Sequence, residues 1–290
     1  MSLSRFVVSL VIAGVALAGC AKPPEPHMVA RAEAPLITNS ILQGSQAITQ
    51  QPMPERIFSA GSLGGRTLAV ASTTDIILRP GEVVLTFDDG PRPGKTPEIL
   101  ATLDQFGVKA TFLMLGSAAQ AHPVLAQQVA ARGHTVGSHT FDHVDLNTLG
   151  RQAALDEIAK GERAVHLALA GGGQVLSPFF RFPYLSQTGF LRTNLMQGSM
   201  VILDVDIDSK DYYKDTPEVI AARTLSRLDA RGSGIILFHD IHQRTVETLP
   251  LFLAQLEERG YSVVRLVPKD TGIFGRDLIT ADGPLLRGTL

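Results

Sequence analysis

Ionisable side chains follow several apolar segments of this sequence, each near the point where the segment ends. These side chains are Asp88 with Asp89, His139, Arg181, Asp206 with Asp208, and His239. Carboxylates and imidazoles bind metal ions and transfer protons, and a guanidinium can hold a carboxylate in place. Because the carboxyl ends of parallel strands share one edge, we expect these groups to meet on a single face of the fold.

Two histidines, His139 and His143, are four positions apart. On a helical turn this spacing directs both imidazoles toward one point. Imidazoles suit Zn²⁺, and one carboxylate would complete a three-ligand site with positions open for water and substrate. The alternative is a pair of surface histidines near the start of a helix, because this spacing alone is a weak signal.

Two adjacent carboxylates, Asp88 and Asp89, follow the apolar segment Val83–Phe87. Their charges are costly after a buried strand unless a cation or hydrogen bonds compensate them. A metal ion could bind one carboxylate and leave the other as a base. A turn is the alternative, since Asp89 is followed by Gly90 and Pro91, but a turn does not explain the second acid.

Arg181 and His239 allow both structural and catalytic interpretations. Arg181 stands among aromatic residues, where a guanidinium usually pairs with a carboxylate. The acids that could pair with it are Asp204, Asp206, Asp208 and Asp211. His239 follows an apolar strand, so a hydrogen-bonded core histidine is the alternative to a proton donor. Four other histidines are interpreted as structural: His122, His134, His166 and His242.

The segments that must position these residues alternate between strands and helices. Strands are expected at Val83–Phe87, Val108–Leu115, Thr135–Ser138, Phe179–Arg181, Met200–Val205, Gly234–Phe238 and Tyr261–Leu266, with a further strand or hairpin within Thr67–Leu78. Helices are expected at Thr96–Gln105, Pro123–Arg132, Asn147–Ala170, Pro217–Ala230 and Val246–Arg259. Seven strands alternating with helices predict an α/β fold with a parallel sheet, either open or closed into a barrel.

The composition is that of a globular chain. A hydrophobic share of 44% and a charged share of 19% exclude a wholly disordered, collagen-like or coiled-coil protein. The 290 residues allow one or two domains at about 150 residues each. A net charge of −2 gives no indication of a nucleic-acid partner. The single cysteine, Cys20, excludes an internal disulfide and a zinc site made of thiolates alone.

Residues 1–19 have the features of a lipoprotein signal peptide. Arg5 precedes an apolar run, Phe6–Leu17, that is shorter than the roughly 20 residues of a membrane span. The sequence Leu17–Cys20 resembles the lipobox of bacterial lipoproteins, in which the cysteine becomes the lipidated first residue. The alternative is an ordinary signal peptide with an incidental cysteine.

The rest of the chain divides into a tether, one domain and a tail. Residues 20–66 are rich in Pro, Ala, Gln, Ser and Gly, which predicts a flexible tether. Residues 67–270 form the expected barrel domain, and residues 271–290 a C-terminal tail. Ala21 stands where an aspartate would resemble an inner-membrane retention signal, so we expect the periplasmic face of the outer membrane of a bacterial cell envelope.

Five motifs occur in order along the domain. They are T-F-D-D-G-P at Thr86–Pro91, H-T-x-x-H at His139–His143, R-x-P-Y at Arg181–Tyr184, I-D-S-x-D-aromatic at Ile207–Tyr212 and L-x-H at Leu237–His239. Together they resemble the motifs of the polysaccharide deacetylases, the NodB-homology family, over about residues 82–268. The resemblance implies a single distorted (β/α)7 barrel that hydrolyses N-acetyl groups of a glycan with the aid of a divalent metal.

The resemblance also implies a role for each motif residue. Asp89, His139 and His143 would bind the metal. Asp88 would be the general base and Arg181 would orient it, since a neighbouring guanidinium favours the ionised carboxylate.

The later motifs would complete the reaction site. By the same resemblance, His239 would be the general acid and Asp211 would tune it. The backbone N–H of Tyr184 would help to bind the oxyanion of the tetrahedral intermediate. A histidine is suited to giving the leaving amine its proton near neutral pH.

The substrate pocket is expected to contain Leu237, Tyr212 and Pro183. Many family members have Trp at the position of Tyr212, and this chain has no Trp. The aromatic wall is therefore retained in a different form, which leaves the sugar preference open. Asp206 is expected to add negative charge near the site.

We expect one divalent metal, Zn²⁺ in the first place, with Co²⁺ or Ni²⁺ as alternatives. The expected partners are an N-acetylated polysaccharide, namely peptidoglycan or an exported polysaccharide, and a membrane reached through Cys20; a monomer is expected, without a nucleic-acid partner. Family resemblance leaves O-acetyl esters and small amides open as substrates.

Two functions of other classes remain as alternatives. One is a cell-wall-binding lipoprotein with weak or no turnover on the same fold. The other is a non-haem iron oxygenase, because two histidines and one carboxylate also suit Fe(II). The sequence supplies no cosubstrate site for an oxygenase, and Asp88 and His239 suit hydrolysis better.

Overall fold

Nine strands, all paired in parallel, form the frame of residues 63–269, which are the residues that this computed structural model describes. The strands are β1 (Gly64–Val70), β2 (Glu82–Asp88), β3 (Thr111–Met114), β4 (Thr135–Ser138), β5 (Phe179–Phe180), β6 (Val201–Ile202), β7 (Ile207–Asp208), β8 (Gly234–His239) and β9 (Ser262–Pro268). Strands β2 to β8 make a nearly closed barrel, because β2 pairs with β3 on one side and with β8 on the other. Among the described strands, the path from β2 through β3, β4 and β5 ends at β6, and β7 pairs only with β8.

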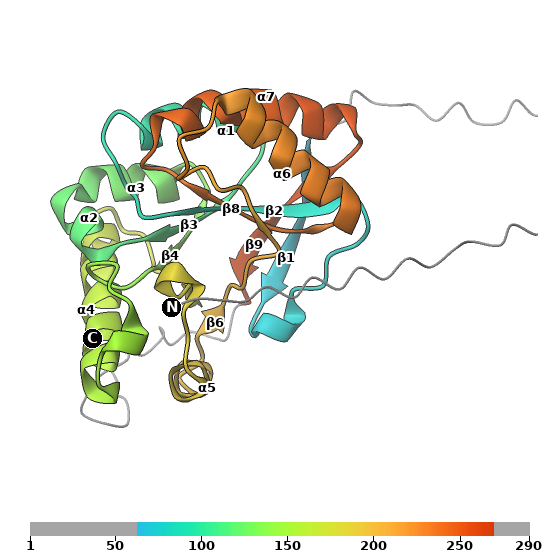
Figure 1. The fold of residues 1–290 in the computed structure, drawn as a ribbon. Coiled ribbons are helices and arrows are strands. Elements are labelled where there is room, and N and C mark those ends of the chain that lie inside the picture. Colours follow the sequence, from blue (N-terminus) through green and yellow to red (C-terminus); the bar gives the residue numbers. More distant parts are fainter. Residues whose placement is uncertain (1–62, 270–290) are drawn as a thin grey trace, which may run out of the picture. The chain divides into compact units, whose positions relative to one another are not determined.

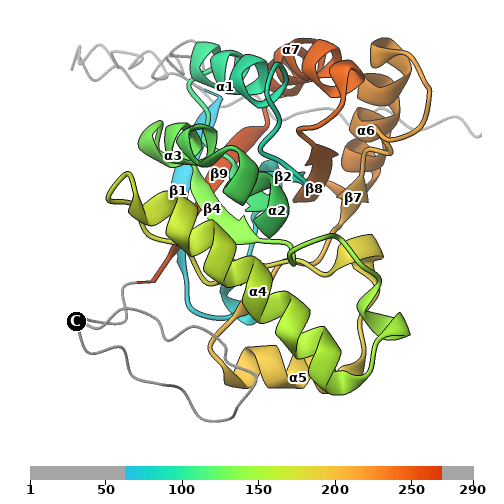
Figure 2. The same cartoon turned by 90° about the vertical axis from the view of Figure 1, so that its left-hand side faces the viewer.

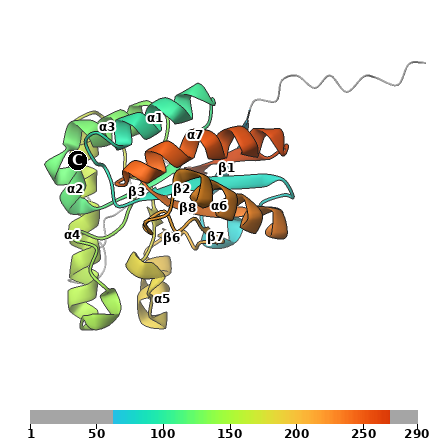
Figure 3. The same ribbon diagram turned by 45° about the horizontal axis from the view of Figure 1, so that its top comes forward.

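Helices cover the outside of this barrel. They are α1 (Thr96–Gln105), α2 (Gly116–Ala121), α3 (Pro123–Ala131), α4 (Arg151–Ala170), α5 (Gly189–Gln197), α6 (Pro217–Arg231) and α7 (Gln243–Glu258). Figure 1 shows α1, α6 and α7 as a layer over β2 and β8, and Figure 3 shows the same layer from above. Helices α2, α3 and α4 lie together on a neighbouring side of the barrel, in front of β4 in Figure 2.

Local sequence explains where the helices begin and end. Helix α6 begins at Pro217, which suits a first turn because its missing N–H would have no helical partner. The Thr216 hydroxyl caps the same helix by accepting the N–H of Val219. Gly232 ends it with a left-handed backbone, a conformation that glycine adopts without steric cost.

The alternation of side chains along each strand separates two apolar clusters. In β2, Val83 and Phe87 face the helices and join a large outer core with residues of α1, α6 and α7. Val84 faces the other way and packs inside the barrel with Leu113 and Ile235. Because the side-chain period of a strand is two, Thr86 and Asp88 share the inner side with Val84. This alternation carries polar groups into one end of the barrel.

The single (β/α)7 barrel predicted from the sequence is confirmed, although two strands differ from the expected set. The two-residue strand β7 belongs to the ring and was not predicted. The segment expected as the last barrel strand is β9, which pairs with the start of β2 and carries β1 on its outer edge. β1 begins at Gly64, so this strand includes the last residues of the range expected as tether.

Smaller differences concern short elements. The strand expected over Val108–Leu115 is limited to Thr111–Met114, and the long helix begins at Arg151 instead of Asn147. Helices α2 and α5 were not predicted. Both are shorter than the window of 11–18 residues over which helical periodicity becomes visible.

The predicted signal peptide, the lipidation site Cys20, most of the tether and the C-terminal tail lie outside the described residues. Within residues 63–269, no helix has the length and apolar character required to cross a bilayer.

Candidate active site

A cavity of about 460 Å³ opens at the carboxyl ends of the barrel strands. Its lining residues are Asp88, Asp89, His139, His143, Phe182, Tyr184, Leu185, Asp208, Tyr212, Leu237, His239 and His242. Asp88 and His239 are the last residues of β2 and β8 and stand opposite each other in the register of the two strands. The strand ends therefore bring most of the ionisable groups singled out in the sequence to one cavity.

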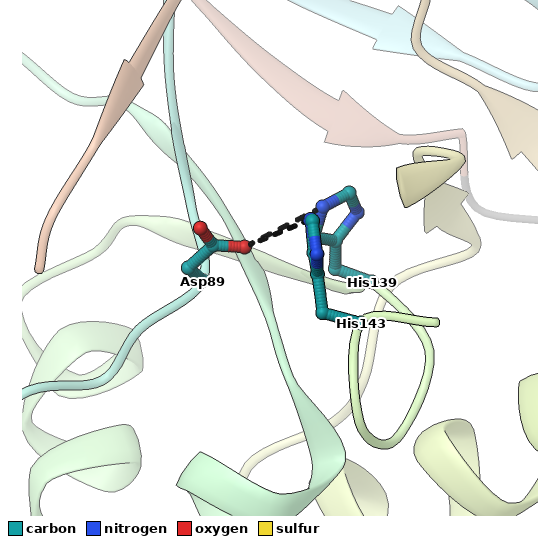
Figure 4. A group of neighbouring side chains, drawn as sticks. All are labelled: Asp89, His139 and His143. Atoms are coloured by element: carbon teal, nitrogen blue, oxygen red, sulfur yellow. Dashed lines mark ion pairs between the residues drawn. The ribbon is translucent and has the colours of Figure 1, made fainter. Parts of the chain in front are cut away.

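Asp89, His139 and His143 form a candidate metal site in this cavity. Asp89 Oδ1 lies 3.6 Å from His139 Nε2 and 3.5 Å from His143 Nε2, and one ligand atom from each residue falls within 4.8 Å of the other two. Figure 4 shows the carboxylate directed toward both imidazoles. Asp89 Oδ1 is buried and has no hydrogen-bond partner among the described residues, so a cation would satisfy it.

The protonation of the two imidazoles also fits a divalent cation. His139 Nδ1 lies 2.7 Å from the carbonyl oxygen of Arg181 and donates to it, which leaves Nε2, the atom that faces Asp89, as the one available to a metal. Burial lowers the pKa of His143 and favours the neutral ring that a metal requires. The donor set of two imidazoles and one carboxylate is one that Zn²⁺ accepts.

The two histidines do not lie on a helical turn, contrary to the sequence-based expectation. Residues 139–145 follow β4 as a bend, and Thr140 and His143 have positive φ values of 68° and 57°. Asp89 has a φ of 77° in the facing loop. Such backbone is unfavourable for residues with a side chain and persists where the surroundings enforce it. The two imidazoles converge because the loop folds back on itself.

Helix α4 enforces the bend of this loop, a contact that was not predicted from the sequence. The carboxylate of Glu157 accepts the N–H groups of Phe141 and Asp142 at 3.0 and 2.7 Å. Gly161 lets the helix backbone approach the loop closely, since a Cβ there would lie 2.3 Å from the carbonyl carbon of Thr140. A glycine inside an otherwise regular helical pattern was the one signal available in the sequence.

Asp88 is held by the guanidinium of Arg181 inside the barrel. Arg181 Nη1 donates to Asp88 Oδ1 and to Thr86 Oγ1, both at 2.8 Å, and Nε donates to the Leu203 carbonyl at 3.0 Å. Asp88 and Arg181 are both almost fully buried. The second oxygen of Asp88 lies 3.8 Å from His139 Nε2, beside the candidate metal site. A carboxylate fixed in this way can accept a proton next to the metal.

His239 is paired with a buried carboxylate behind it. Its Nδ1 lies 2.7 Å from Asp211 Oδ1, and its backbone N–H donates to Asp211 Oδ2 at 2.7 Å. Burial alone would lower the pKa of His239, but the hydrogen bond and the charge of Asp211 outweigh it and raise the pKa to about 9. His239 is therefore protonated near neutral pH and can act as an acid.

Aromatic side chains form part of the cavity wall. Tyr212 packs edge-on against the His239 ring with centroids 5.6 Å apart, and its hydroxyl donates to Asp208 Oδ2 at 2.8 Å. Tyr184 packs edge-on against His143 at 4.5 Å and remains 67% exposed. Leu237 also lines the cavity. Pro183, expected in the pocket wall, is buried and does not line the cavity.

Two acids considered in the sequence lie away from the cavity. The Asp204 carboxylate pairs with Arg192, and that of Asp206 pairs with Arg231 and accepts the Ile235 N–H. Asp206 precedes the first residue of β7, so it sits at the opposite end of the strand from the site and adds no charge there. The expectation for Asp206 was therefore wrong.

Two histidines interpreted as structural differ in their placement. His134 is buried, its Nδ1 accepts the Ala110 N–H, and burial lowers its pKa to about 3, in agreement with a structural role. His242 instead lines the cavity, 6.0 Å from His239 between ring centroids.

Comparisons with known proteins identify relatives of the whole domain. A sequence model of the family described as polysaccharide deacetylase matches residues 77–197. The peptidoglycan-N-acetylglucosamine deacetylase PgdA of Listeria monocytogenes is 31% identical over 185 residues, which are 63% of this chain and 38% of the relative. The chitin deacetylase of Colletotrichum lindemuthianum is 34% identical over 218 residues, which are 71% of this chain and 86% of the relative.

A solved structure shows the same fold. The peptidoglycan deacetylase of Bdellovibrio bacteriovorus aligns with a TM-score of 0.62 and 37% identity over 72% of this chain and 57% of that one. The chain thus spans less than two thirds of the length of the relatives from Listeria and Bdellovibrio. It spans most of the length of the relative from Colletotrichum. Identity of 34% across 86% of a relative establishes common descent of the domain, and the chain belongs to the polysaccharide deacetylase family.

Proposed function

We propose that this protein is a metal-dependent hydrolase that removes acetyl groups from the nitrogen of an N-acetylated glycan. The observation that carries the proposal is the joint placement of the three candidate metal ligands, Asp88 and His239 on one cavity. Asp88 is held by Arg181 and His239 by Asp211, so a base and an acid have separate supports. This division of roles is what amide hydrolysis requires.

The reaction can be written from the residues in place. A divalent cation held by Asp89, His139 and His143 would polarise the acetyl carbonyl and make water more acidic. Asp88 accepts a proton from a water molecule while the oxygen of that water bonds to the acetyl carbon. His239 then gives its proton to the nitrogen while the carbon–nitrogen bond breaks, which releases acetate and a free amine.

The names of the relatives support N-acetylglucosamine polymers as the substrate class. The bacterial relatives are peptidoglycan deacetylases and the fungal relative is a chitin deacetylase. The exposed rings of Tyr184 and Tyr212 at the cavity give a sugar apolar surface to pack against. We propose peptidoglycan or an exported polysaccharide as the substrate, and Zn²⁺ as the metal, with Co²⁺ or Ni²⁺ as alternatives.

We also propose that the protein is anchored by lipid at Cys20, on the periplasmic face of the outer membrane. The apolar run and the small residues before this single cysteine support the proposal. Several acyl chains on one residue would anchor the chain stably, at about 0.8 kcal/mol per buried CH₂. Mass spectrometry of the mature N-terminus tests it: a lipidated Cys20 is expected, and an unmodified Cys20 would contradict it.

A substrate panel tests the proposed activity. The metal-loaded protein is incubated with N-acetylglucosamine oligomers, peptidoglycan and O-acetylated xylan, and acetate and free amines are measured together. We expect acetate with matching amines from the first two. Acetate from xylan alone would indicate an esterase instead, and no product from any substrate would favour a binding protein. Asp88→Asn, which keeps the shape of the side chain, serves as the inactive control.

A further inference from the structure

A buried carboxylate behind the cavity has no part in the reaction described above. Asp240 follows His239 at the end of β8, is 1% exposed, and is not a lining residue of the cavity. Its Oδ2 accepts the hydroxyl of Thr96, the first residue of α1, at 2.6 Å. Burying a carboxyl group is costly, so its position calls for an explanation in the structure around it.

The carboxylate of Asp240 lies directly against the loop that carries the metal ligand Asp89. A Cβ at Gly90 would stand 2.1 and 2.2 Å from the two carboxylate oxygens, so only glycine leaves room for them. The backbone N–H of Asp240 also donates to the carbonyl of Asp88 at 3.3 Å. Asp240 therefore contacts the backbone on both sides of Asp89.

Thr96 extends this contact to the far side of the same loop. Its hydroxyl oxygen accepts the N–H of Arg92 at 2.7 Å while its proton goes to Asp240. The segment from Asp88 to Arg92 is thus bonded at one end to the backbone N–H of Asp240 and at the other to the hydroxyl of Thr96, and a hydrogen bond joins the side chains of Thr96 and Asp240. These contacts join the segment to the start of α1, which follows it in the chain, and to the end of β8, which is distant in sequence.

Asp89 needs such support from its surroundings. Its φ of 77° is unfavourable for a residue with a side chain, and its Oδ1 has no hydrogen-bond partner among the described residues. Its contacts with the two histidines, at 3.6 and 3.5 Å, are longer than hydrogen bonds. The backbone on either side of Asp89 is held by Asp240 and Thr96, which keeps the carboxylate near the two imidazoles.

We propose that Asp240, together with Thr96, is a positioning residue that fixes the Asp89 loop in the conformation that binds the metal. The inference rests on the proposed function, since it assigns a purpose to a metal at Asp89. Residues that orient metal ligands from behind typically change metal affinity by about 10–100-fold when altered.

Metal affinity, measured without turnover, tests the inference. Zn²⁺ is titrated into the metal-free full chain in competition with a chromogenic chelator. Thr96→Val removes the hydroxyl and keeps the shape of the side chain, and Asp240→Ala removes the carboxylate. We expect each to weaken Zn²⁺ binding by about 10–100-fold, while Thr96→Ser retains the wild-type affinity.

A matched control separates positioning from general destabilisation. Thr224→Val removes an equally buried hydroxyl, which donates to the Ile220 carbonyl within α6 and has no contact with the loop. We expect this variant to lose stability and to keep its Zn²⁺ affinity. At saturating Zn²⁺ we expect the kcat of Thr96→Val to return toward the wild-type value, which a structural defect would not allow.

The outcomes distinguish this inference from the proposed function. Wild-type affinity in both Thr96→Val and Asp240→Ala would overturn the positioning role while leaving the proposed function intact. If Asp240→Ala fails to fold, Thr96→Val and Thr96→Ser alone decide the question. A wild-type chain that binds no stoichiometric metal would overturn the proposed function and the positioning role together.

Discussion

Replacing Asp211 by asparagine removes a buried charge beside the proposed general acid and leaves most of the geometry in place. The asparagine oxygen can still accept the hydrogen bond from His239 Nδ1, which spans 2.7 Å in the native protein. Thr245 donates its hydroxyl to the other carboxylate oxygen at 2.6 Å and helps to fix the group. The amide nitrogen replaces Oδ2, which accepts the backbone N–H of His239 and the Thr245 hydroxyl, so the substitution removes the charge together with the acceptor of that N–H.

The size of the effect follows from the pKa of His239. An ordinary histidine has a pKa of 6.5, and here it is about 9, a difference worth about 3 kcal/mol in favour of the protonated ring. Without the charge of Asp211, only the charges of Asp88 and Asp89 oppose the effect of burial, so the pKa of His239 falls from about 9 toward its ordinary value of 6.5. At about pH 7.5 the protonated fraction of His239 then falls from more than about nine-tenths to about one-tenth.

The pH dependence of kcat/KM measures this change. Activity that needs a protonated His239 is present below its pKa and is lost as the pH rises through it. We expect the alkaline limb of the profile to move down by up to about two pH units in Asp211→Asn. Asp204→Asn is the matched control, because Asp204 pairs with Arg192 away from the cavity. The alkaline limb of the pH profile should not move in this variant. An unchanged alkaline limb in Asp211→Asn would refute the assignment of His239 as the acid.

Three further substitutions test the other parts of the site. Asp88→Asn should keep one metal per chain and lose about 10²–10⁴ in kcat; full activity would show that Asp88 is not the base. His139→Ala should abolish metal binding and the metal-induced rise in Tm; stoichiometric metal in this variant would contradict the ligand assignment. Arg181→Met leaves the buried Asp88 charge unpaired and should lower the free energy of unfolding by about 3–5 kcal/mol in denaturant titration, whereas wild-type stability would show that the pair is not needed to bury Asp88.

The position of the site could be predicted because strand alternation is visible in the sequence. Val84, Thr86 and Asp88 share one side of β2, so an acid at the end of the strand had to face the same interior as the apolar residues before it. The same reasoning applies to Leu237 and His239 in β8. Parallel pairing then brings the strand ends together, as the register of Asp88 with His239 shows.

The errors arose where short-range pattern does not determine the backbone. The spacing of His139 and His143 suits a helical turn, but Gly161 and Glu157 of α4 hold these residues in a bend instead. Asp206 was expected just past a strand Met200–Val205, but it precedes β7, whose two residues are too few to show alternation in the sequence. In both cases the deciding contact comes from elsewhere in the chain.

The supporting residues were the hardest to find from sequence. Asp240 and Thr96 are 144 positions apart, and neither carries a pattern that indicates a buried hydrogen bond between them. In the sequence Glu157 is an ordinary acid of a helix. In the structure its carboxylate accepts the N–H groups of Phe141 and Asp142, in the loop that contains His139 and His143. Residues that line the cavity recur at strand ends, whereas residues that hold those side chains in place follow from packing alone.

The central claim is that acetyl groups are hydrolysed at a metal held by Asp89, His139 and His143. The most direct test is to titrate the metal-free protein with Zn²⁺ while following acetate release from an N-acetylglucosamine oligomer. We predict no activity without metal and a linear rise that saturates at one Zn²⁺ per chain. Two results would contradict the account. One is acetate release from the metal-free protein at the rate of the Zn²⁺-loaded protein, and the other is a protein saturated with Zn²⁺ that releases no acetate.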